Sequence, residues 1–327
     1  MEAAVLHEAG GTPVHGARPD PADSDGDGRT LVRVSAAPVA PLDVLAASGT
    51  SYFGVPALPY VPGVAGVGRV VRSGTHPVGA RVHVSTTAGT GAGDGTLAEL
   101  VAVPDASCTV LPEGPPDDAT VAALGMSAVA AWHALVVRGR LVAGERVLVL
   151  GAGGTVGQVA VQVARHVGAA TVVGAARSAA GRERALALGA DAAPDLDALD
   201  DLAAAGGGAY DLVLDPLGGA PATAAVGALA VGGRLVHLGS SAGPEVTVPS
   251  AVLRSRALEV LGHTNTHLGP EQVAHALLAV LAVPGVTVAH ETSPLAEVGT
   301  AWRRQAGGTA TARQVVLVGR GDLSRSG

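Results

Sequence analysis

Apolar runs bounded by glycine or polar residues divide the second half of the chain into alternating strands and helices. Three of them, residues 146–150, 171–175 and 210–215, are apolar at nearly every position. Such runs are typical of parallel strands that are buried on both faces. Helices are expected at residues 156–167 and 222–229. This order of elements predicts a doubly wound parallel sheet.

Further elements flank this core. Residues 234–238 and 258–261 are predicted strands, and residues 118–135 and 270–281 are predicted helices. A final strand at residues 314–318 is expected to return to the first part of the chain.

The first part of the chain has the pattern of a mostly β lobe. Residues 30–34 alternate between apolar and polar side chains, which is typical of a half-buried strand. Short strands are also predicted at 3–7, 66–71, 78–84 and 95–104, and a short helix ends near Gly49. Turns rich in glycine, proline and aspartate separate these elements.

The length of 327 residues is too great for one ordinary core, so two domains are expected. The switch in pattern predicts a mostly β domain from residues 1–117 and 268–327. Residues 118–267 are predicted to form the parallel-sheet domain. With an aromatic share of only 2%, both cores must consist mainly of Val, Leu and Ala.

Composition excludes several classes of function. A net charge of −7 argues against general nucleic-acid binding. All 21 basic residues are arginine, which excludes a lysine Schiff base. The single cysteine, Cys108, excludes a disulfide framework and a multi-cysteine zinc site. The amino terminus lacks a basic region and no apolar run reaches the length of a membrane span, so a cytoplasmic location without a membrane partner is expected.

A glycine-rich turn follows the strand at residues 146–150 and has the pattern Ala152-x-Gly154-x-x-Gly157. Glycine permits a close approach of a ligand to the backbone, and the N-terminus of the next helix favours negative charge. The strand before the turn and the helix after it are the context that a dinucleotide site requires. The predicted phosphate-binding residues are Ala152, Gly153, Gly154, Thr155, Val156 and Gly157.

The end of the next predicted strand indicates which nicotinamide cofactor binds. An NAD site would place an acidic residue here, but the chain has Ala176, followed by Arg177, Ser178 and, further on, Arg182. A guanidinium group binds a 2′-phosphate that a carboxylate would repel. These residues predict NADPH, the alternative being that both arginines are solvated charges at the start of a helix.

Taken in order, these segments resemble the zinc-free quinone oxidoreductase branch of the medium-chain dehydrogenase/reductase family. The resemblance covers nearly the whole chain and depends on the number and order of short motifs. They are Arg33-Val34-x-Ala36, Pro41-x-Asp43, Leu58-Pro59-Tyr60-x-Pro62-Gly63, Val78-Gly79-x-Arg81-Val82, Trp132-His133-Ala134-Leu135, Gly154-x-Val156-Gly157, Gly189-Ala190-Asp191, Asp211-x-Val213-x-Asp215-Pro216-x-Gly218-Gly219 and Gly232-Gly233-Arg234-Leu235-Val236.

The resemblance implies a GroES-like β lobe, a Rossmann domain, an active site between them and a homodimer. It also implies a metal-free enzyme, because Ala40 and the pair Val64-Ala65 stand where zinc-dependent relatives carry a cysteine and a His-Glu pair. The one local pair with ligand spacing, His263-x-x-x-His267, lies in a predicted loop and lacks a third ligand. No metal site is therefore expected.

The implied reaction is hydride transfer from NADPH to a small-molecule quinone or α,β-unsaturated carbonyl compound. Three family positions differ, since Ala40, Leu45 and Ala130 stand where relatives often carry Asn, Tyr and Thr. This departure leaves two alternatives open. One is a biosynthetic enzyme such as a cyclase or isomerase, and the other is a non-catalytic protein that binds a dinucleotide or nucleic acid.

Few polar side chains remain as catalytic candidates. Tyr52 lies near a family tyrosine position and is a candidate donor, unless it only packs as a loop aromatic. His263 and Asn265 follow a predicted strand end, where a donor to a substrate carbonyl is expected, although loop histidines are commonly structural. Gly239 and Ser240 follow another strand and are predicted to line the nicotinamide pocket.

Overall fold

The computed structural model describes residues 1–21, 28–50 and 54–319, and the chain divides into two compact units. The first unit comprises Met1–Gly125 together with the chain from Val288 onward, and the second comprises Met126–Thr287. The boundaries expected from the sequence, at residues 117 and 268, lie earlier in the chain than the observed divisions after Gly125 and after Thr287.

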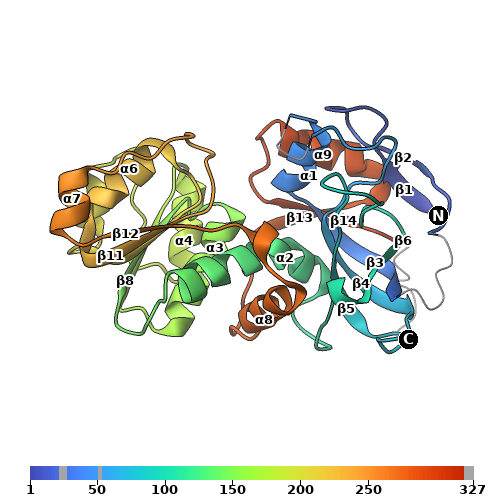
Figure 1. Ribbon diagram of the computed structural model, residues 1–327, viewed down its shortest axis with the longest axis horizontal. Coiled ribbons are helices and arrows are strands. Elements are labelled where there is room, and N and C mark those ends of the chain that lie inside the picture. The colour runs from blue at the N-terminus through green and yellow to red at the C-terminus, as the bar shows by residue number, and fades with distance from the viewer. Residues whose placement is uncertain (22–27, 51–53, 320–327) are drawn as a thin grey trace. The chain divides into compact units, whose positions relative to one another are not determined.

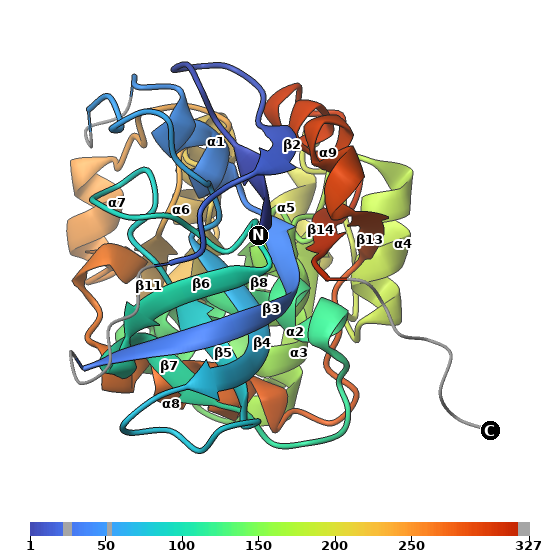
Figure 2. The ribbon, with the colours of Figure 1, turned by 90° about the vertical axis from the view of Figure 1, so that its right-hand side faces the viewer.

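The first unit is built on a mixed sheet with the strand order β13-β14-β3-β4-β5-β7, in which β6 also pairs with β3. Figure 2 shows β3, β4, β5 and β6 of this sheet in blue to green. The strands are β3 (Arg29–Val39), β4 (Ala65–Arg72), β5 (Arg81–Ser85), β6 (Leu100–Pro104), β7 (Cys108–Val110), β13 (His290–Pro294) and β14 (Arg313–Leu317). Buried and exposed residues alternate along the first half of β3, as the sequence pattern predicted.

A two-stranded antiparallel sheet and two helices complete this unit. The sheet pairs β1 (Glu2–Val5) with β2 (Val14–Ala17). Helices α1 (Pro41–Ala47) and α9 (Val298–Ala306) contact each other and lie close together in Figure 1. Short 3₁₀ helices occur at η1 (Asp105–Ser107) and η4 (Leu295–Glu297). Valine, alanine and leucine dominate the core, with Trp302 as its largest side chain.

The second unit is built on a five-stranded sheet in which every neighbouring pair is parallel. Its order is β12-β11-β10-β8-β9, and Figure 1 shows several of its strands and helices from green to orange. The strands are β8 (Arg146–Leu150), β9 (Thr171–Ala175), β10 (Tyr210–Asp215), β11 (Leu229–His237) and β12 (Glu259–Gly262). The predicted doubly wound sheet is thereby confirmed.

Several helices follow or connect the strands of the second unit in its described part. They are α3 (Thr155–Val167), α4 (Ala179–Ala187), α5 (Asp201–Ala205), α6 (Gly219–Gly227), α7 (Ser250–Ser255) and α8 (Pro270–Leu281), with a π-helix η2 (His133–Arg138) and a 3₁₀ helix η3 (Asn265–His267). Because β8 lies between β9 and β10, the strand order reverses at β8. In open α/β sheets, ligands bind at the carboxyl ends of strands where the order reverses.

Helix α2 (Asp118–Trp132) contains the point where the two units divide. Gly125 has a φ of 33° and a ψ of −130°, which interrupts the helix before it continues into η2. The helix predicted at residues 118–135 is therefore two segments. Together, Asp118–Arg138 are long and apolar enough to span a membrane by length and composition, contrary to the expectation from the sequence. About two thirds of the qualifying window is buried, as in the core helix of a soluble protein.

Other elements differ from their predictions for local reasons. The helix predicted at 222–229 begins at Gly219 and ends at Gly227, because Leu229 already belongs to β11. The final strand is confirmed, since β14 pairs antiparallel with β3. Strands β2, β7 and β13 were not predicted, because they are short and carry few apolar residues.

Candidate functional site

Glycines determine the path of the turn between β8 and α3. Gly151 has a φ of +66°, and its carbonyl accepts a hydrogen bond from the Gly154 amide at 2.9 Å. A Cβ atom added at Gly157 would lie 2.4 Å from the Gly151 carbonyl oxygen, so α3 packs directly against the end of β8. The first N–H groups of an α-helix have no partner within it. The turn therefore has backbone donors suited to a phosphate group.

The predicted phosphate-binding residues of this turn differ in exposure. Gly154 is exposed, whereas Gly153, Thr155 and Val156 are half-buried. Ala152 is fully buried, and its amide donates to the carbonyl of Ala175 in β9 at 2.9 Å. Ala152 therefore packs the turn against β9, and its amide is already used within the sheet.

A buried polar side chain fixes the turn from within α3. Gln158 is 2% exposed, and its amide donates to the Gly153 carbonyl at 2.9 Å. Gln162, one turn later, donates to the Gln158 carbonyl at 2.9 Å and to the Thr287 carbonyl at 2.7 Å. These residues were not predicted from the sequence, although two glutamines on the buried face of an apolar helix are a usable signal.

The end of β9 leads into a capped helix. Ala176 is buried, and Arg177 and Ser178 are exposed. The Ser178 hydroxyl accepts a hydrogen bond from the Gly181 amide at 3.0 Å and caps α4. A Cβ atom added at Gly153 would lie 3.2 Å from the Cα atom of Gly181, so this segment lies against the glycine turn.

Arg182 is occupied by contacts within the protein. Its guanidinium forms an ion pair with Asp195 at 2.8 Å and donates to the carbonyl of Arg177 at 2.7 Å. Asp195 lies near Arg182 because it forms a parallel bridge with Ala176. Arg182 therefore holds the segment that carries Arg177. The guanidinium of Arg184 also reaches the Gly153 carbonyl, at 3.4 Å, a contact that the sequence did not suggest.

Two loops at the carboxyl ends of β10 and β11 interlock through their backbones. Added Cβ atoms would lie 2.4 Å from Pro216 O at Gly239 and 2.4 Å from Gly243 O at Gly218, so both positions require glycine. The Ala242 amide donates to the Leu217 carbonyl at 2.8 Å. These contacts hold Gly239 and Ser240, the predicted nicotinamide residues, against the loop after β10.

Asp215 anchors both loops. One carboxylate oxygen accepts the amides of Leu217 and Gly218 at 2.9 Å each. The other oxygen pairs with Nδ1 of His237 at 2.6 Å. Asp215 is fully buried and His237 is half-buried. This buried pair joins the ends of two adjacent parallel strands.

The structure places His263 and Asn265 together in the second unit. Nε2 of His263 and Oδ1 of Asn265 are 3.0 Å apart, and the Asn265 amide donates to the Met126 carbonyl at 2.9 Å. The His263 ring stacks on His133, with centroids 5.8 Å apart and planes 5° from parallel. The third catalytic candidate, Tyr52, lies outside the described residues.

Burial lowers the pKa of His263, and the charges of His133 and Arg138 lower it further, while the hydrogen bond with Asn265 opposes them. The neutral imidazole is therefore favoured over the charged form.

A cavity of about 640 Å³ lies where β11 and β12 end. This volume is within the range of small-molecule sites. It is lined by Arg138, His237, Leu238, Gly239, Ser240, Gly262, His263, Thr264, His267 and Leu268.

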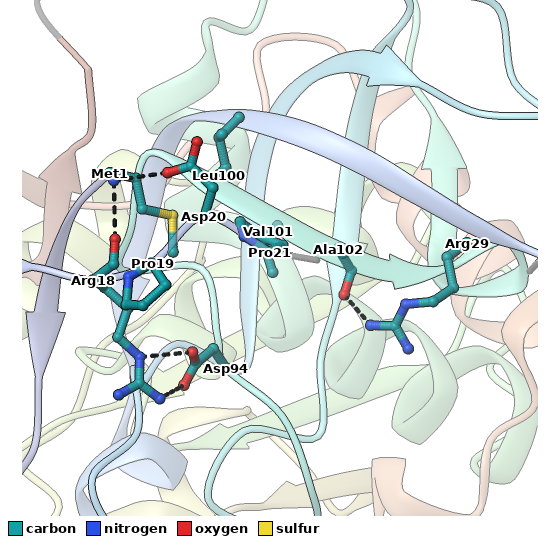
Figure 3. Close-up of a pocket in the computed structure, with 10 residues that line it drawn as sticks. All are labelled: Met1, Arg18, Pro19, Asp20, Pro21, Arg29, Asp94, Leu100, Val101 and Ala102. Atoms are coloured by element: carbon teal, nitrogen blue, oxygen red, sulfur yellow. Dashed lines mark hydrogen bonds and ion pairs between the residues drawn. The ribbon is translucent and has the colours of Figure 1, made fainter. Parts of the chain in front are cut away.

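A second cavity, also about 640 Å³, lies in the first unit and contains none of the predicted site residues (Figure 3). Figure 3 shows how its charges pair with one another. Arg18 binds the carboxylate of Asp94 at 3.1 Å, and the Met1 amine binds Asp20 at 2.8 Å. The guanidinium of Arg29 donates to the Ala102 carbonyl.

Three positions depart from the family pattern by carrying apolar side chains, and the structure shows where they lie. Ala40 precedes α1, Leu45 is 45% exposed on α1, and Ala130 is buried in α2. Asp43 holds Ala40 in place, because its carboxylate accepts hydrogen bonds from the amides of Ala40 at 2.7 Å and Val64 at 2.8 Å. Burial raises the pKa of Asp43 to about 6, against these hydrogen bonds.

Within residues 1–21, 28–50 and 54–319, no group of three or more His, Cys, Asp or Glu side chains is placed to hold a metal ion. His263 lies beside His133 and Asn265, and no acidic residue lines the cavity that it shares with His267.

Comparison with known proteins identifies both parts of the chain. Residues 26–113 match the family described as alcohol dehydrogenase GroES-like domain, and residues 155–282 match the family described as zinc-binding dehydrogenase. The human quinone oxidoreductase is 32% identical over 249 residues, which are 73% of each chain. A phenolphthiocerol/phthiocerol polyketide synthase from Mycobacterium tuberculosis is 36% identical over 217 residues. That match covers 64% of this chain but only 9% of the synthase polypeptide.

Solved structures agree with this assignment. The quinone oxidoreductase of Thermus thermophilus, solved alone and with NADPH, has a TM-score of 0.80 and 32% identity, covering 97% of this chain and all of that one. AibC, at 23% identity and a TM-score of 0.83, shares the fold. A GroES-like unit and a Rossmann unit in one chain define a dinucleotide-dependent oxidoreductase architecture. The chain belongs to the medium-chain dehydrogenase/reductase family and is similar to its quinone oxidoreductases.

Proposed function

We propose that this protein is an NADPH-dependent, metal-free reductase that transfers hydride to a quinone or an α,β-unsaturated carbonyl compound. The observation that carries the proposal is the glycine turn before α3, next to an exposed Arg177 and without an acidic residue at Ala176. The NADPH complex of the Thermus thermophilus relative supports the same cofactor.

The residues present fit this cofactor. The absence of side chains at Gly153 and Gly154 leaves the backbone of the turn open to a pyrophosphate group, and Gly157 lets the start of α3 pack directly against the turn. Arg177 would hold the 2′-phosphate, with Ser178 and Arg182 positioning it, and Gly239 and Ser240 would contact the nicotinamide end. When bound, NADPH supplies a hydride from C4 of the nicotinamide.

The remaining roles belong to the candidates in the loop after β12. We propose that the neutral ring of His263 donates a hydrogen bond to the substrate carbonyl, and that Asn265 positions this ring through the hydrogen bond at 3.0 Å. Tyr52 remains a further candidate donor. By resemblance, we also propose a homodimer in the cytoplasm that acts on a small molecule, without a nucleic-acid or membrane partner.

A direct test is oxidation of NADPH by the purified full chain, followed by the loss of its near-ultraviolet absorbance. The acceptors should include a benzoquinone, a simple enone and an unsaturated acyl thioester, because polyketide synthases are among the relatives. We expect turnover with at least one acceptor and a preference for NADPH over NADH. Tight NADPH binding without oxidation by any acceptor would overturn the proposal and favour a cyclase, an isomerase or a binding protein.

A further inference from the structure

The polar lining of the cavity at the ends of β11 and β12 has one kind of charge. Four of its residues carry a cationic or potentially cationic side chain: Arg138, His237, His263 and His267. Ser240 and Thr264 add hydroxyl groups, and no lining residue is acidic. The whole protein has a net charge of −7, so a cavity lined by basic and hydroxyl side chains without an acidic one differs from the rest of the chain.

The cation of Arg138 has no internal counter-charge in the part of the chain that the structure describes, where no ion pair to its guanidinium is formed. His237 differs, because Asp215 pairs with its Nδ1 from within the protein. In the cavity of the first unit, by contrast, Asp94 neutralises Arg18 and Asp20 neutralises the amino terminus (Figure 3). The two cavities have similar volumes, and of these two only the cavity of the second unit lacks acidic lining.

The contacts of His263 indicate the same excess of positive over negative charge. His263 stacks on a second imidazole, that of His133, and Arg138 acts on it as a positive neighbour. A negative ligand would balance the charge of Arg138, and its guanidinium plane suits two oxygens of one anion.

We propose that this cavity binds an oxyanion, a carboxylate or phosphate group of the substrate, and that Arg138 is its principal contact. Thr264 and His267 supply further donors. The binding site is inferred from the cavity alone, whereas its assignment to the substrate rests on the proposed function. The substrate class is then an electron-poor acceptor that carries an anionic group.

Binding is tested on the full chain by titration with inorganic phosphate, with succinate and with neutral succinamide at constant ionic strength. The ring signals of His263 in nuclear magnetic resonance are the readout. We expect one of the oxyanions to saturate and to raise the pKa of His263, and succinamide to have no effect. The tighter of phosphate and succinate identifies the kind of anion.

Arg138→Gln should weaken this binding by about tenfold or more, since it removes a charged hydrogen-bond donor. Arg138→Lys should give an intermediate loss, because the charge remains and the bidentate geometry does not. Arg254→Gln is the matched control, since Arg254 is an exposed arginine on α7 of the same unit. Equal affinity in Arg138→Gln and Arg254→Gln, or no saturable binding of any oxyanion, would overturn the site.

Two further measurements separate this site from the cofactor and from the proposed reaction. Oxyanion binding should persist when NADPH is saturating, and complete displacement by NADPH would overturn the assignment to the substrate. With paired acceptors that carry a carboxylate or its amide, Arg138→Gln should raise KM about tenfold for the acid alone and leave kcat nearly unchanged. An equal rise for both acceptors would also overturn that assignment. If no acceptor oxidises NADPH, the proposed function fails, while the binding titrations still decide the oxyanion site.

Discussion

His83 is a buried imidazole on β5 whose two ring nitrogens have no hydrogen-bond partner in the described part of the chain. It is 1% exposed, and a Cβ atom added at Gly125 would lie 3.7 Å from its Nε2. Burial lowers the pKa of His83 to about 4, from an ordinary value of 6.5. This residue therefore couples the stability of the first unit to pH.

Stability should decline as the pH falls from 6.5 toward 4. In this range the unfolded chain binds a proton at His83 and the folded chain does not, so protonation favours unfolding. The expected loss is about 3 kcal/mol. His83→Leu removes this loss. As the pH falls from 7 to 4, the unfolding free energy of the variant should therefore rise relative to that of the parent by about 3 kcal/mol. Urea unfolding at both pH values measures the difference.

The control for this prediction is His7→Leu, because His7 is exposed in the same unit. A pH-dependent difference as large in His7→Leu as in His83→Leu would show that buried His83 is not its source.

Arg177 and Arg182 are predicted to have different effects on cofactor choice. Arg177→Ala should raise the KM for NADPH about tenfold and leave that for NADH nearly unchanged, because only NADPH carries the 2′-phosphate. Arg182→Ala should weaken both cofactors, since it releases the segment that Asp195 and Arg182 hold. Steady-state kinetics with each cofactor distinguishes the two. An equal effect of Arg177→Ala on both cofactors would rule out its contact with the 2′-phosphate.

These two arginines also show where prediction from sequence ends at the level of residues. The basic segment after β9 was visible because Arg177 and Arg182 follow an apolar strand without an acidic residue. Asp195 was not visible as their neighbour, since it reaches this segment only through its bridge with Ala176. Tertiary contacts of this kind decide which of two similar side chains is available to a ligand.

At the level of elements, the sequence predicted best the strands whose burial is complete. Residues 146–150 and 171–175 matched β8 and β9 because nearly every position of a covered parallel strand is buried and apolar. Strand β13 was missed because it comprises His290–Pro294 and is largely exposed, so it carries no apolar pattern although it pairs with β14. Cavities were beyond prediction, because His263 and Arg138 meet only after folding.

The junction of β8 and α3 should tolerate no side chain at Gly157. Gly157→Ala would place a Cβ atom 2.4 Å from the Gly151 carbonyl and 2.6 Å from the Ala152 Cα atom, both of which are backbone atoms. We expect a loss of about 2 kcal/mol or more in unfolding free energy, together with weaker NADPH binding. Denaturant unfolding and fluorescence titration measure the two effects.

Gly227→Ala is the matched control for this substitution. Gly227 ends α6 in the same unit, and a Cβ atom added there has no heavy atom within 4 Å. The control should be neutral or slightly stabilising, because alanine reduces the freedom of the unfolded chain. Similar losses in both variants would mean that the close contact at Gly157 is not responsible.

At the level of the whole molecule, the sequence predicted two domains with boundaries at residues 117 and 268, and the chain divides into two compact units at Gly125 and Thr287. Helix α8 belongs to the second unit, where the Gln272 carbonyl lies 3.3 Å from Nε2 of His133 and Thr287 bonds to Gln162. The first unit is discontinuous, since β14 returns to pair with β3. An amphipathic helix alone does not reveal which of two cores it covers, so this boundary depends on tertiary contacts.

Every residue proposed to hold the adenosine end of NADPH lies in the second unit. Fragments of the cofactor that contain this end should therefore bind to the second unit. Adenosine 2′,5′-bisphosphate should stabilise the protein more than adenosine 5′-diphosphate, because Arg177 pairs with the 2′-phosphate. Above saturation, each tenfold increase in the concentration of adenosine 2′,5′-bisphosphate should add about 1.4 kcal/mol to the unfolding free energy. Hydrogen exchange should slow at residues 151–157 and 176–182, while the amides that pair β14 with β3 serve as an internal reference. Slower exchange at β14 alone, or equal stabilisation by both fragments, would contradict this location of the cofactor site.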